Sequence, residues 1–230
     1  MTTTLITGGN KGLGYEAARR LLAEGHDVWV AARDPQRGGQ AADRLGARFV
    51  ALDVTDEQSV RAAVAAIQEA GGLDVLINNA GIAGNRRPVA ETTVEDVRTV
   101  FETNVLGVIR VTQAFVPLLE HSQAPVIVNV SSGMGSLAVT SDPGRLESGF
   151  VGLAYSPSKA ALNMLTTQYA KALPSMRVNA VDPGYTATDL NNHRGTQTVQ
   201  EGTDAIVRMA CVGSDGPTGT FTDRHGVVPW

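Results

Sequence analysis

The stretch "TTLITGGNKGLGYEAARRLLAEG", residues 3–25, decides the fold of this chain. It starts with a short β-rich run, passes through a turn that contains Gly8, Gly12 and Gly14, and ends in a segment with helical periodicity. Glycine lets a backbone approach a pyrophosphate closely, and the free N–H groups at a helix start attract anions. A strand, a glycine-rich turn and a helix in this order therefore predict a dinucleotide-binding unit.

The alternation of strands and helices continues along the whole chain. Further β-rich runs occur at 27–32, 48–52, 74–78, 125–131, 177–182 and 219–222. Helical stretches separate most of them, and several runs are apolar nearly throughout, as parallel strands covered on both faces are. We expect an α/β fold: a Rossmann-type doubly wound parallel sheet of about seven strands with helices on both faces. We expect one dinucleotide-binding domain over residues 1–230, because no linker divides the chain.

Composition narrows the possible partners. The 230 residues carry a net charge of −4, which argues against nucleic-acid or anionic-membrane binding, since both need a basic face. No apolar run approaches the roughly 20 residues that span a membrane, and no signal peptide is visible, so a soluble, cytoplasmic protein is expected. The lone cysteine, Cys211, excludes an internal disulfide and is expected to be buried. The four histidines lack ligand-like spacing, so no metal site is expected.

The end of the second strand indicates which dinucleotide is bound. NAD-preferring sites place an acidic residue there, but this sequence has Ala32 followed by Arg33. Arginine pairs well with a 2′-phosphate, and Lys11 in the glycine turn can add a second positive charge. NADP(H) is therefore the predicted cofactor, with Asp34 as the remaining acid that could serve NAD.

Tyr155 and Lys159 lie four residues apart on a predicted helix, so both face the same side. A phenol titrates near pH 10, and a neighbouring ammonium group lowers that value by stabilising the phenolate. Tyr155 could then exchange a proton with a carbonyl oxygen. Pro157 is tolerated only in the first turn of a helix, which places Tyr155 at the helix start. By spacing alone, an ordinary exposed pair of side chains remains an equal alternative.

Seven motifs in order carry a resemblance to a known family. They are "TGGNKGLG" (7–14), "LDVTD" (52–56), "NNAG" (78–81), "TNVLG" (103–107), "VNVSSGMG" (128–135), Tyr155-x-x-x-Lys159 and "DPGYTAT" (182–188). Together they cover most of the chain. The sequence resembles the short-chain dehydrogenase/reductases and is most similar to their NADPH-dependent carbonyl reductases.

The resemblance implies roles for individual residues. Tyr155 would be the proton donor and Lys159 its partner, while Ser132 would hydrogen-bond the substrate carbonyl. Asn104 would hold a water that links Lys159 to solvent. The implied cofactor-binding residues are Gly8, Asn10, Lys11, Gly12, Leu13, Gly14, Arg33, Asp53, Val54, Asn79, Gly81, Tyr155, Lys159, Pro183, Gly184, Thr186 and Thr188.

The expected activity is the NADPH-dependent reduction of a small-molecule ketone or aldehyde to an alcohol. Loops 133–152 and 184–197 follow strand ends and are the expected walls of the substrate site. Candidates for an apolar pocket are Met134, Leu137, Phe150, Tyr185 and Trp230.

Two other functions stay open: an NAD-linked alcohol dehydrogenase, and a non-catalytic NADP(H)-binding sensor or interaction protein. The interval of 23 residues between Ser132 and Tyr155 leaves both a monomer and a homo-oligomer open. In the family, Asn or Cys often stands where this chain has Asp182.

Overall fold

A computed structural model describes residues 1–85 and 87–230. Its centre is a seven-stranded parallel sheet in the order β3-β2-β1-β4-β5-β6-β7. The predicted Rossmann-type fold is therefore confirmed. The strands are β1 (Thr3–Thr7), β2 (Asp27–Ala32), β3 (Arg48–Ala51), β4 (Val75–Asn78), β5 (Val126–Val130), β6 (Arg177–Val181) and β7 (Phe221–Thr222).

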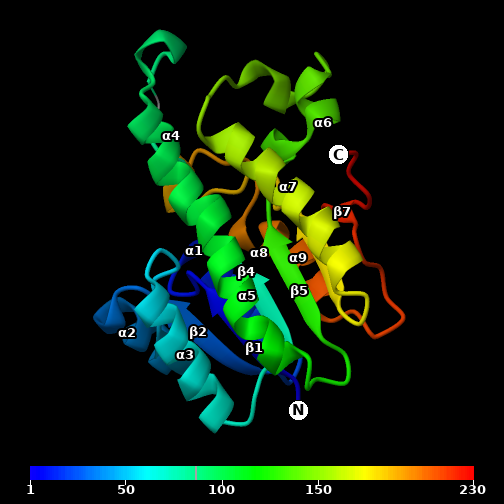
Figure 1. Cartoon of the computed structure of the whole chain (residues 1–230). Coiled ribbons are helices and arrows are strands. Elements are labelled where there is room, and N and C mark those ends of the chain that lie inside the picture. Colours follow the sequence, from blue (N-terminus) through cyan, green and yellow to red (C-terminus); the bar gives the residue numbers. More distant parts are fainter. Residues whose placement is uncertain (86) are drawn as a thin grey trace.

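Helices cover both faces of the sheet. One layer contains α3 (Glu57–Glu69), α5 (Gly107–Leu119) and α7 (Tyr155–Ala172), and all three lie on the near side of the sheet in Figure 1. The other contains α1 (Gly12–Ala23), α2 (Pro35–Leu45) and α9 (Asp204–Ala210).

The sheet faces two hydrophobic cores because neighbouring residues of a strand point to opposite sides. Leu5 of β1 packs in a cluster with Val111 and Phe115 of α5. The next residue, Ile6, packs with Leu21 of α1 and Ile206 of α9. Strands that are apolar throughout follow directly from this double burial.

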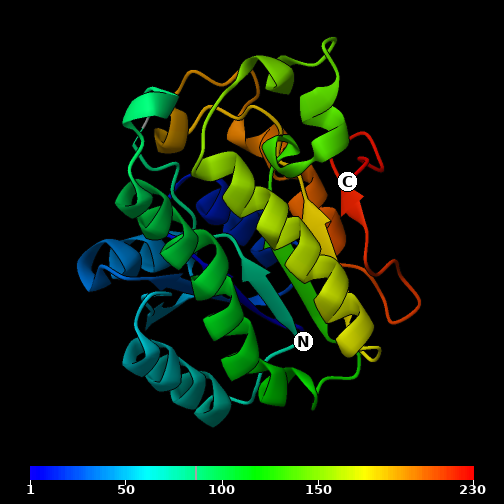
Figure 2. The same ribbon diagram turned by 45° about the horizontal axis from the view of Figure 1, so that its top comes forward.

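Short helices follow the strands at the carboxyl end of the sheet, which lies toward the top of Figure 2. They are η1 (Val89–Glu91) after β4; η3 (Gly133–Gly135), α6 (Leu137–Ser141) and η4 (Leu146–Gly149) after β5; and η5 (Asp189–Asn191) and α8 (Val199–Gly202) after β6. A π-helical segment, η2 (Glu102–Leu106), joins α4 (Val94–Phe101) to α5.

The strand order creates a crevice. The chain runs outward from β1 to β2 and β3, then returns to place β4 on the other side of β1. Loops leaving β1 and β4 therefore diverge, and ligands bind at this point in open α/β sheets. Helix α7 begins at Tyr155 with Pro157 in its first turn, as predicted.

Two expectations need correction. Cys211 is exposed rather than buried, because α9 ends at Ala210 and Cys211 follows its last turn. The final strand is shorter than the predicted 219–222, since Gly219 adopts a positive φ of 69° that breaks the extended run. None of the helices among the described residues is both long enough and apolar enough to cross a membrane.

Candidate active site

A cleft with a volume of about 490 Å³ opens at the carboxyl ends of β1 to β4. We call it the cofactor cleft. Its walls come from the glycine turn, from the ends of β2 and β3, and from the segment after β4. Twelve of the predicted cofactor residues line it: Gly8, Asn10, Lys11, Gly12, Leu13, Gly14, Arg33, Asp53, Val54, Asn79, Gly81 and Thr188.

The glycine turn packs closely against the segment after β4. Gly8 and Gly12 have φ angles of 63° and 56°, which side-chain-bearing residues rarely adopt. A methyl group placed on Gly14 would lie 2.5 Å from Asn79 Nδ2 and 2.6 Å from the Gly8 carbonyl oxygen. Asn79 in turn donates to the carbonyl oxygens of Thr7 and Gly8, at 2.8 and 3.1 Å. The turn and the segment after β4 are thus locked together at the first turn of α1.

Two charged residues at the end of β2, Arg33 and Asp34, differ in whether their charge is already engaged by the protein. Arg33 is exposed at the end of β2, beside the cleft. Asp34 caps α2 by accepting the backbone N–H groups of Gln36 and Arg37, at 3.0 and 3.1 Å. Its carboxylate is therefore already engaged in holding the helix start.

Lys11 forms an ion pair at the cleft. Its Nζ lies 2.8 Å from Asp189 Oδ2, and Asp189 Oδ1 lies 2.9 Å from His193 Nε2. The pKa of Asp189 is lowered, mainly by its hydrogen bond with Lys11. This partner of Lys11 was not foreseen, because residues 11 and 189 are distant in sequence and meet only across the cleft.

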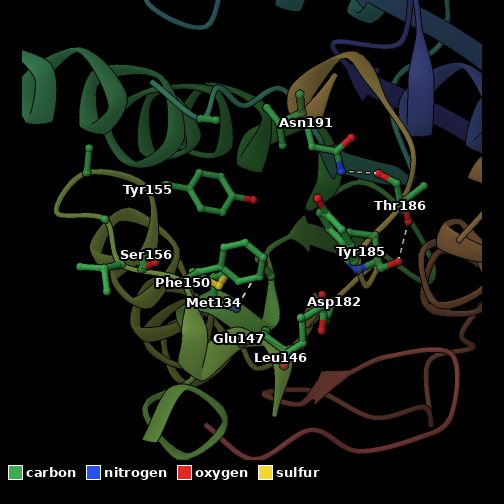
Figure 3. A pocket seen from close by; sticks show the side chains of 18 of the residues that line it. Met134, Leu146, Glu147, Phe150, Tyr155, Ser156, Asp182, Tyr185, Thr186 and Asn191 are labelled. Carbon is green, nitrogen blue, oxygen red and sulfur yellow. Dashed lines mark hydrogen bonds between the residues drawn. The ribbon is translucent and has the colours of Figure 1, made fainter. Parts of the chain in front are cut away.

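A second cavity, of about 260 Å³, lies beside Tyr155, and we call it the reaction pocket. Figure 3 shows the Tyr155 hydroxyl pointing into it. Ser132 lines the same pocket. Loops 133–152 and 184–197 contribute to its walls, as predicted, with Met134, Phe150 and Tyr185 among the lining residues.

Two residues expected in this pocket lie elsewhere. Leu137, at the start of α6, is 74% exposed. Trp230 stacks on Phe221, with ring centroids 5.4 Å apart and planes inclined by 20°. Neither residue therefore lines the reaction pocket.

The two cavities adjoin. Leu13, Ala83, Thr188 and Leu190 line both of them. Three of the predicted cofactor residues, Pro183, Gly184 and Thr186, line the reaction pocket instead of the cofactor cleft. They directly follow β6, which β5 separates from β4. Thr188, further along the same loop, reaches the cleft.

Lys159 is buried beneath Tyr155. Its Nζ lies 5.7 Å from the centroid of the Tyr155 ring and donates to the Val130 carbonyl oxygen at 2.8 Å. Burial lowers the pKa of Lys159 to about 8, while the negative charge of Asp182 partly opposes this shift. A cation is thus held beside the phenol inside the protein.

Asn104 lies within the π-helical segment η2 and is fully buried. Its side chain accepts from Ile82 N at 2.9 Å and donates to Ile82 O at 2.9 Å and to Ser158 Oγ at 3.0 Å. A methyl group on Gly81 would lie 3.3 Å from Asn104 Oδ1 and 3.6 Å from Lys159 Nζ. Asn104 and Lys159 therefore flank the same glycine, although 55 residues separate them along the chain.

Ser132 starts η3 and accepts a hydrogen bond from Met134 N at 3.2 Å. Because that bond uses an oxygen lone pair, the Ser132 hydroxyl proton can be donated into the pocket. The described structure thus brings all four predicted catalytic side chains to one end of the sheet, two in the pocket wall and two behind it.

Several polar residues near the cavities were missed. Asn85, Arg87, Glu147 and Asn191 line the reaction pocket, and Asp189 lines the cofactor cleft. Their positions in the sequence could have identified them, since each residue follows a strand that ends at this edge of the sheet. Their side-chain directions depend on loop packing, which the sequence does not display. No group of three metal-ligating side chains occurs among the residues described.

The chemistry of the cofactor cleft fits a nicotinamide dinucleotide. Glycines with positive φ, a helix start beneath them and exposed Lys11 and Arg33 suit phosphate groups. The reaction pocket adjoins this cleft.

Comparisons with known proteins agree with this geometry. The (+)-neomenthol dehydrogenase of Capsicum annuum is 31% identical, with 97% of this chain and 96% of the relative covered. Salutaridine reductase of Papaver bracteatum is 32% identical, with 97% and 94% covered. The crystal structure of NADPH-bound carbonyl reductase from chicken fatty liver is 30% identical, with a TM-score of 0.88, and covers 100% of this chain and 99% of that one. A sequence model of the family described as short chain dehydrogenase matches residues 2–198. The chain therefore belongs to the short-chain dehydrogenase/reductase family.

Proposed function

We propose that this protein reduces a ketone or aldehyde to an alcohol with NADPH. The observation that carries the proposal is the pair of adjoining cavities, with the Tyr155 hydroxyl directed into the second one. The relatives support this reaction class, since their names include a neomenthol dehydrogenase and a salutaridine reductase. The proposal treats residues 1–230 as one domain, because the seven described strands form one sheet.

NADPH, when bound in the cofactor cleft, supplies the hydride. Tyr155 donates a proton to the carbonyl oxygen, and the Ser132 hydroxyl donates a hydrogen bond to the same oxygen. The buried charge of Lys159 stabilises the phenolate that Tyr155 becomes. Asn104 fixes the segment after β4 against α7 and so keeps Lys159 in place.

NADP(H) is favoured over NAD(H) by the end of β2. Arg33 is exposed beside the cleft, whereas Asp34 is occupied as the cap of α2. A 2′-phosphate would therefore meet a guanidinium group there instead of a free carboxylate. The NADPH-bound chicken reductase and a structural neighbour from Burkholderia cenocepacia, a gluconate 5-dehydrogenase in complex with NADP, are consistent with this choice.

Replacing the proton donor tests the reaction. We expect Tyr155→Phe to lower kcat by about 10²- to 10⁴-fold, because the ring is kept and only the transferable proton is lost. NADPH oxidation with aryl and aliphatic ketones measures this effect. Tyr169→Phe on the same helix is the control, since Tyr169 packs in the core. Equal activity of Tyr155→Phe and wild type would overturn the mechanism.

Replacing Arg33 tests the cofactor. We expect Arg33→Ala to raise the Kd for NADPH about tenfold, through loss of a charge-assisted hydrogen bond, and to leave the Kd for NADH nearly unchanged. Fluorescence titration of both cofactors measures the ratio. Arg61→Ala on α3, which pairs with Glu57, is a matched exposed control. An unchanged NADPH affinity would favour an NAD-linked enzyme.

A further inference from the structure

The reaction pocket is built for a bulky apolar molecule. Its wall carries Met134, Leu146, Phe150, Leu153 and Tyr185. Several of these stay exposed: Leu146 is 58% exposed, Phe150 44% and Leu153 45%. Large apolar side chains exposed around a cavity are typical of a surface that a ligand covers.

Among the described lining residues, three charged ones interrupt this apolar wall: Arg87, Glu147 and Asp182. Glu147 lies in η4, and its side chain is 21% exposed, so it can be reached from the pocket. A methyl group placed on Gly133 would lie 3.0 Å from Glu147 Oε1 and 2.9 Å from Asp182 Oδ2. The Glu147 and Asp182 carboxylates therefore approach each other beside Gly133, the residue that follows Ser132.

Asp182 also lines the pocket and adds a second carboxylate there. It is 6% exposed and accepts a hydrogen bond from Gly184 N at 2.9 Å. Its pKa is raised, first by burial and also by the negative charge of Glu147. Two like charges that destabilise one another are both relieved when a cation comes between or beside them.

The described cations near this wall already have partners, and for Arg145 that partner is Glu147 itself. Half-exposed Arg145 approaches the other oxygen of Glu147, with Nε 3.4 Å from Oε2. Arg87 lies 3.7 Å from Asp96, and Lys159 donates to the Val130 carbonyl oxygen. Among the described residues, Arg145 is the one cation within salt-bridge distance of Glu147, and Glu147 still lines the pocket.

An aromatic pair completes the surroundings. Phe150 and Tyr185 lie with ring centroids 6.1 Å apart and planes inclined by 48°, both in the pocket wall. Figure 3 shows these rings together with Glu147 and Asp182 around one cavity. Aromatic faces attract alkylated ammonium groups, and a carboxylate among apolar side chains does the same with much greater strength.

We propose that Glu147, with Phe150 and Tyr185, forms a subsite for a substituted ammonium group, so that the preferred substrates are bulky apolar carbonyl compounds carrying a protonated amine. The inference rests on the proposed carbonyl reduction, because Tyr155 and Ser132 lie in the same pocket. Glu147 binds the amine while the carbonyl oxygen is held at Tyr155.

Isosteric ketones test this preference. One pair is 4′-(dimethylaminomethyl)acetophenone and 4′-isobutylacetophenone; the other is 1-benzyl-4-piperidone and 4-benzylcyclohexanone. Within each pair, one ketone has a protonated nitrogen where the other has a carbon atom. The two pairs differ in the distance between the amine and the carbonyl group. We expect wild type to favour the amine in at least one pair by about tenfold or more in kcat/KM.

Glu147→Gln should bring the ratio of the two kcat/KM values close to one, because the substitution keeps the shape of the side chain and removes its charge. Glu69→Gln at the exposed end of α3 is the matched control and should keep the ratio. Arg145→Gln should increase the ratio, since it removes the cation that competes for Glu147. The inference is overturned if wild type shows no preference in either pair, or if Glu147→Gln lowers both members of a pair equally.

Calorimetry with N,N-dimethylbenzylamine separates this inference from the reaction. If no ketone is reduced but the amine binds to wild type and not to Glu147→Gln, the subsite stands and the proposed function fails. If ketones are reduced and the amine binds equally to both proteins, the proposed function stands and the subsite is refuted.

Discussion

At the scale of single residues, Lys159 shows how burial adjusts a charge for a task. Lys159 is 5% exposed, and its ammonium group donates to one carbonyl oxygen at 2.8 Å. Burial lowers its pKa from 10.5 to about 8, and Asp182 opposes the shift. The folded chain therefore binds fewer protons than the unfolded chain between about pH 8 and 10.5. The contribution of this group to the free energy of unfolding consequently rises with pH through that window.

The same shift predicts a pH limit for the reaction. We expect kcat/KM for carbonyl reduction to fall above about pH 8, because Lys159 loses the charge that stabilises the Tyr155 phenolate. Asp182→Asn should move this fall to lower pH, since the carboxylate that raises the pKa of Lys159 is gone. Steady-state pH profiles measure both. Asp215→Asn in a distant loop should leave the profile unchanged, and an unmoved profile in Asp182→Asn would contradict the assignment.

At the scale of elements, the turn between β1 and α1 depends on close backbone contacts. Gly14 sits in the first turn of α1, where Asn79 and the Gly8 carbonyl oxygen leave no room for a side chain. Gly39 also sits in a helix, α2, but a methyl group there would meet nothing within 4 Å. Two glycines in helices thus have different physical reasons to be present.

These two glycines form a matched test. We expect Gly14→Ala to weaken NADPH binding by at least about tenfold and to destabilise the protein by roughly 1–3 kcal/mol, because the turn must open to admit the methyl group. Gly39→Ala should instead stabilise it by about 0.5–1 kcal/mol, since alanine is the better helix former. Urea unfolding and NADPH titration measure the two effects. A Gly14→Ala protein with normal affinity would show that the close contact at Asn79 is unimportant.

The junction of α4 and α5 connects two parts of the site. A π-helical segment inserts there, and Asn104 bonds to both the N–H and the carbonyl of Ile82. Such segments are frequently found at functional sites. Here Asn104 joins the chain after β4 to Ser158 in the first turn of α7.

At the scale of the whole molecule, the cofactor cleft lies where the sheet reverses its direction of winding. Its walls come from segments near residues 10, 33, 53, 80 and 188, which share no local sequence. A ligand that contacts all of them ties the ends of β1 to β4 together. Cofactor binding should therefore raise the free energy of unfolding of the whole protein.

We expect saturating NADPH, at about 100 times its Kd, to raise the free energy of unfolding by about 2.7 kcal/mol. Thermal unfolding with NADPH and with NADH at equal concentration measures the gain, which should be clearly smaller for NADH. Hydrogen exchange should show the protection at 8–14, 79–84 and 188–190, because these segments face the cleft. Protection confined to surface loops away from the cleft would place the cofactor elsewhere.

Much of this arrangement could be predicted from local pattern. The apolar runs gave strand positions to within a residue or two, because a buried parallel strand needs a continuous apolar sequence. Pro157 fixed the start of α7, because proline lacks the N–H that a helix interior uses. Less local features were missed: Lys11 meets Asp189, and Trp230 stacks on Phe221 instead of lining a pocket.

The sequence by itself determined the doubly wound sheet, the glycine turn and the family to which the chain belongs, since each depends on short-range residue order. The tertiary structure alone decided that Lys159 lies buried below Tyr155, that Asn104 reaches Gly81, and that Glu147 and Asp182 converge beside Gly133. The physical reason is that burial, and the distance between charges from separate elements, arise only when those elements pack, and both set the chemistry of the site.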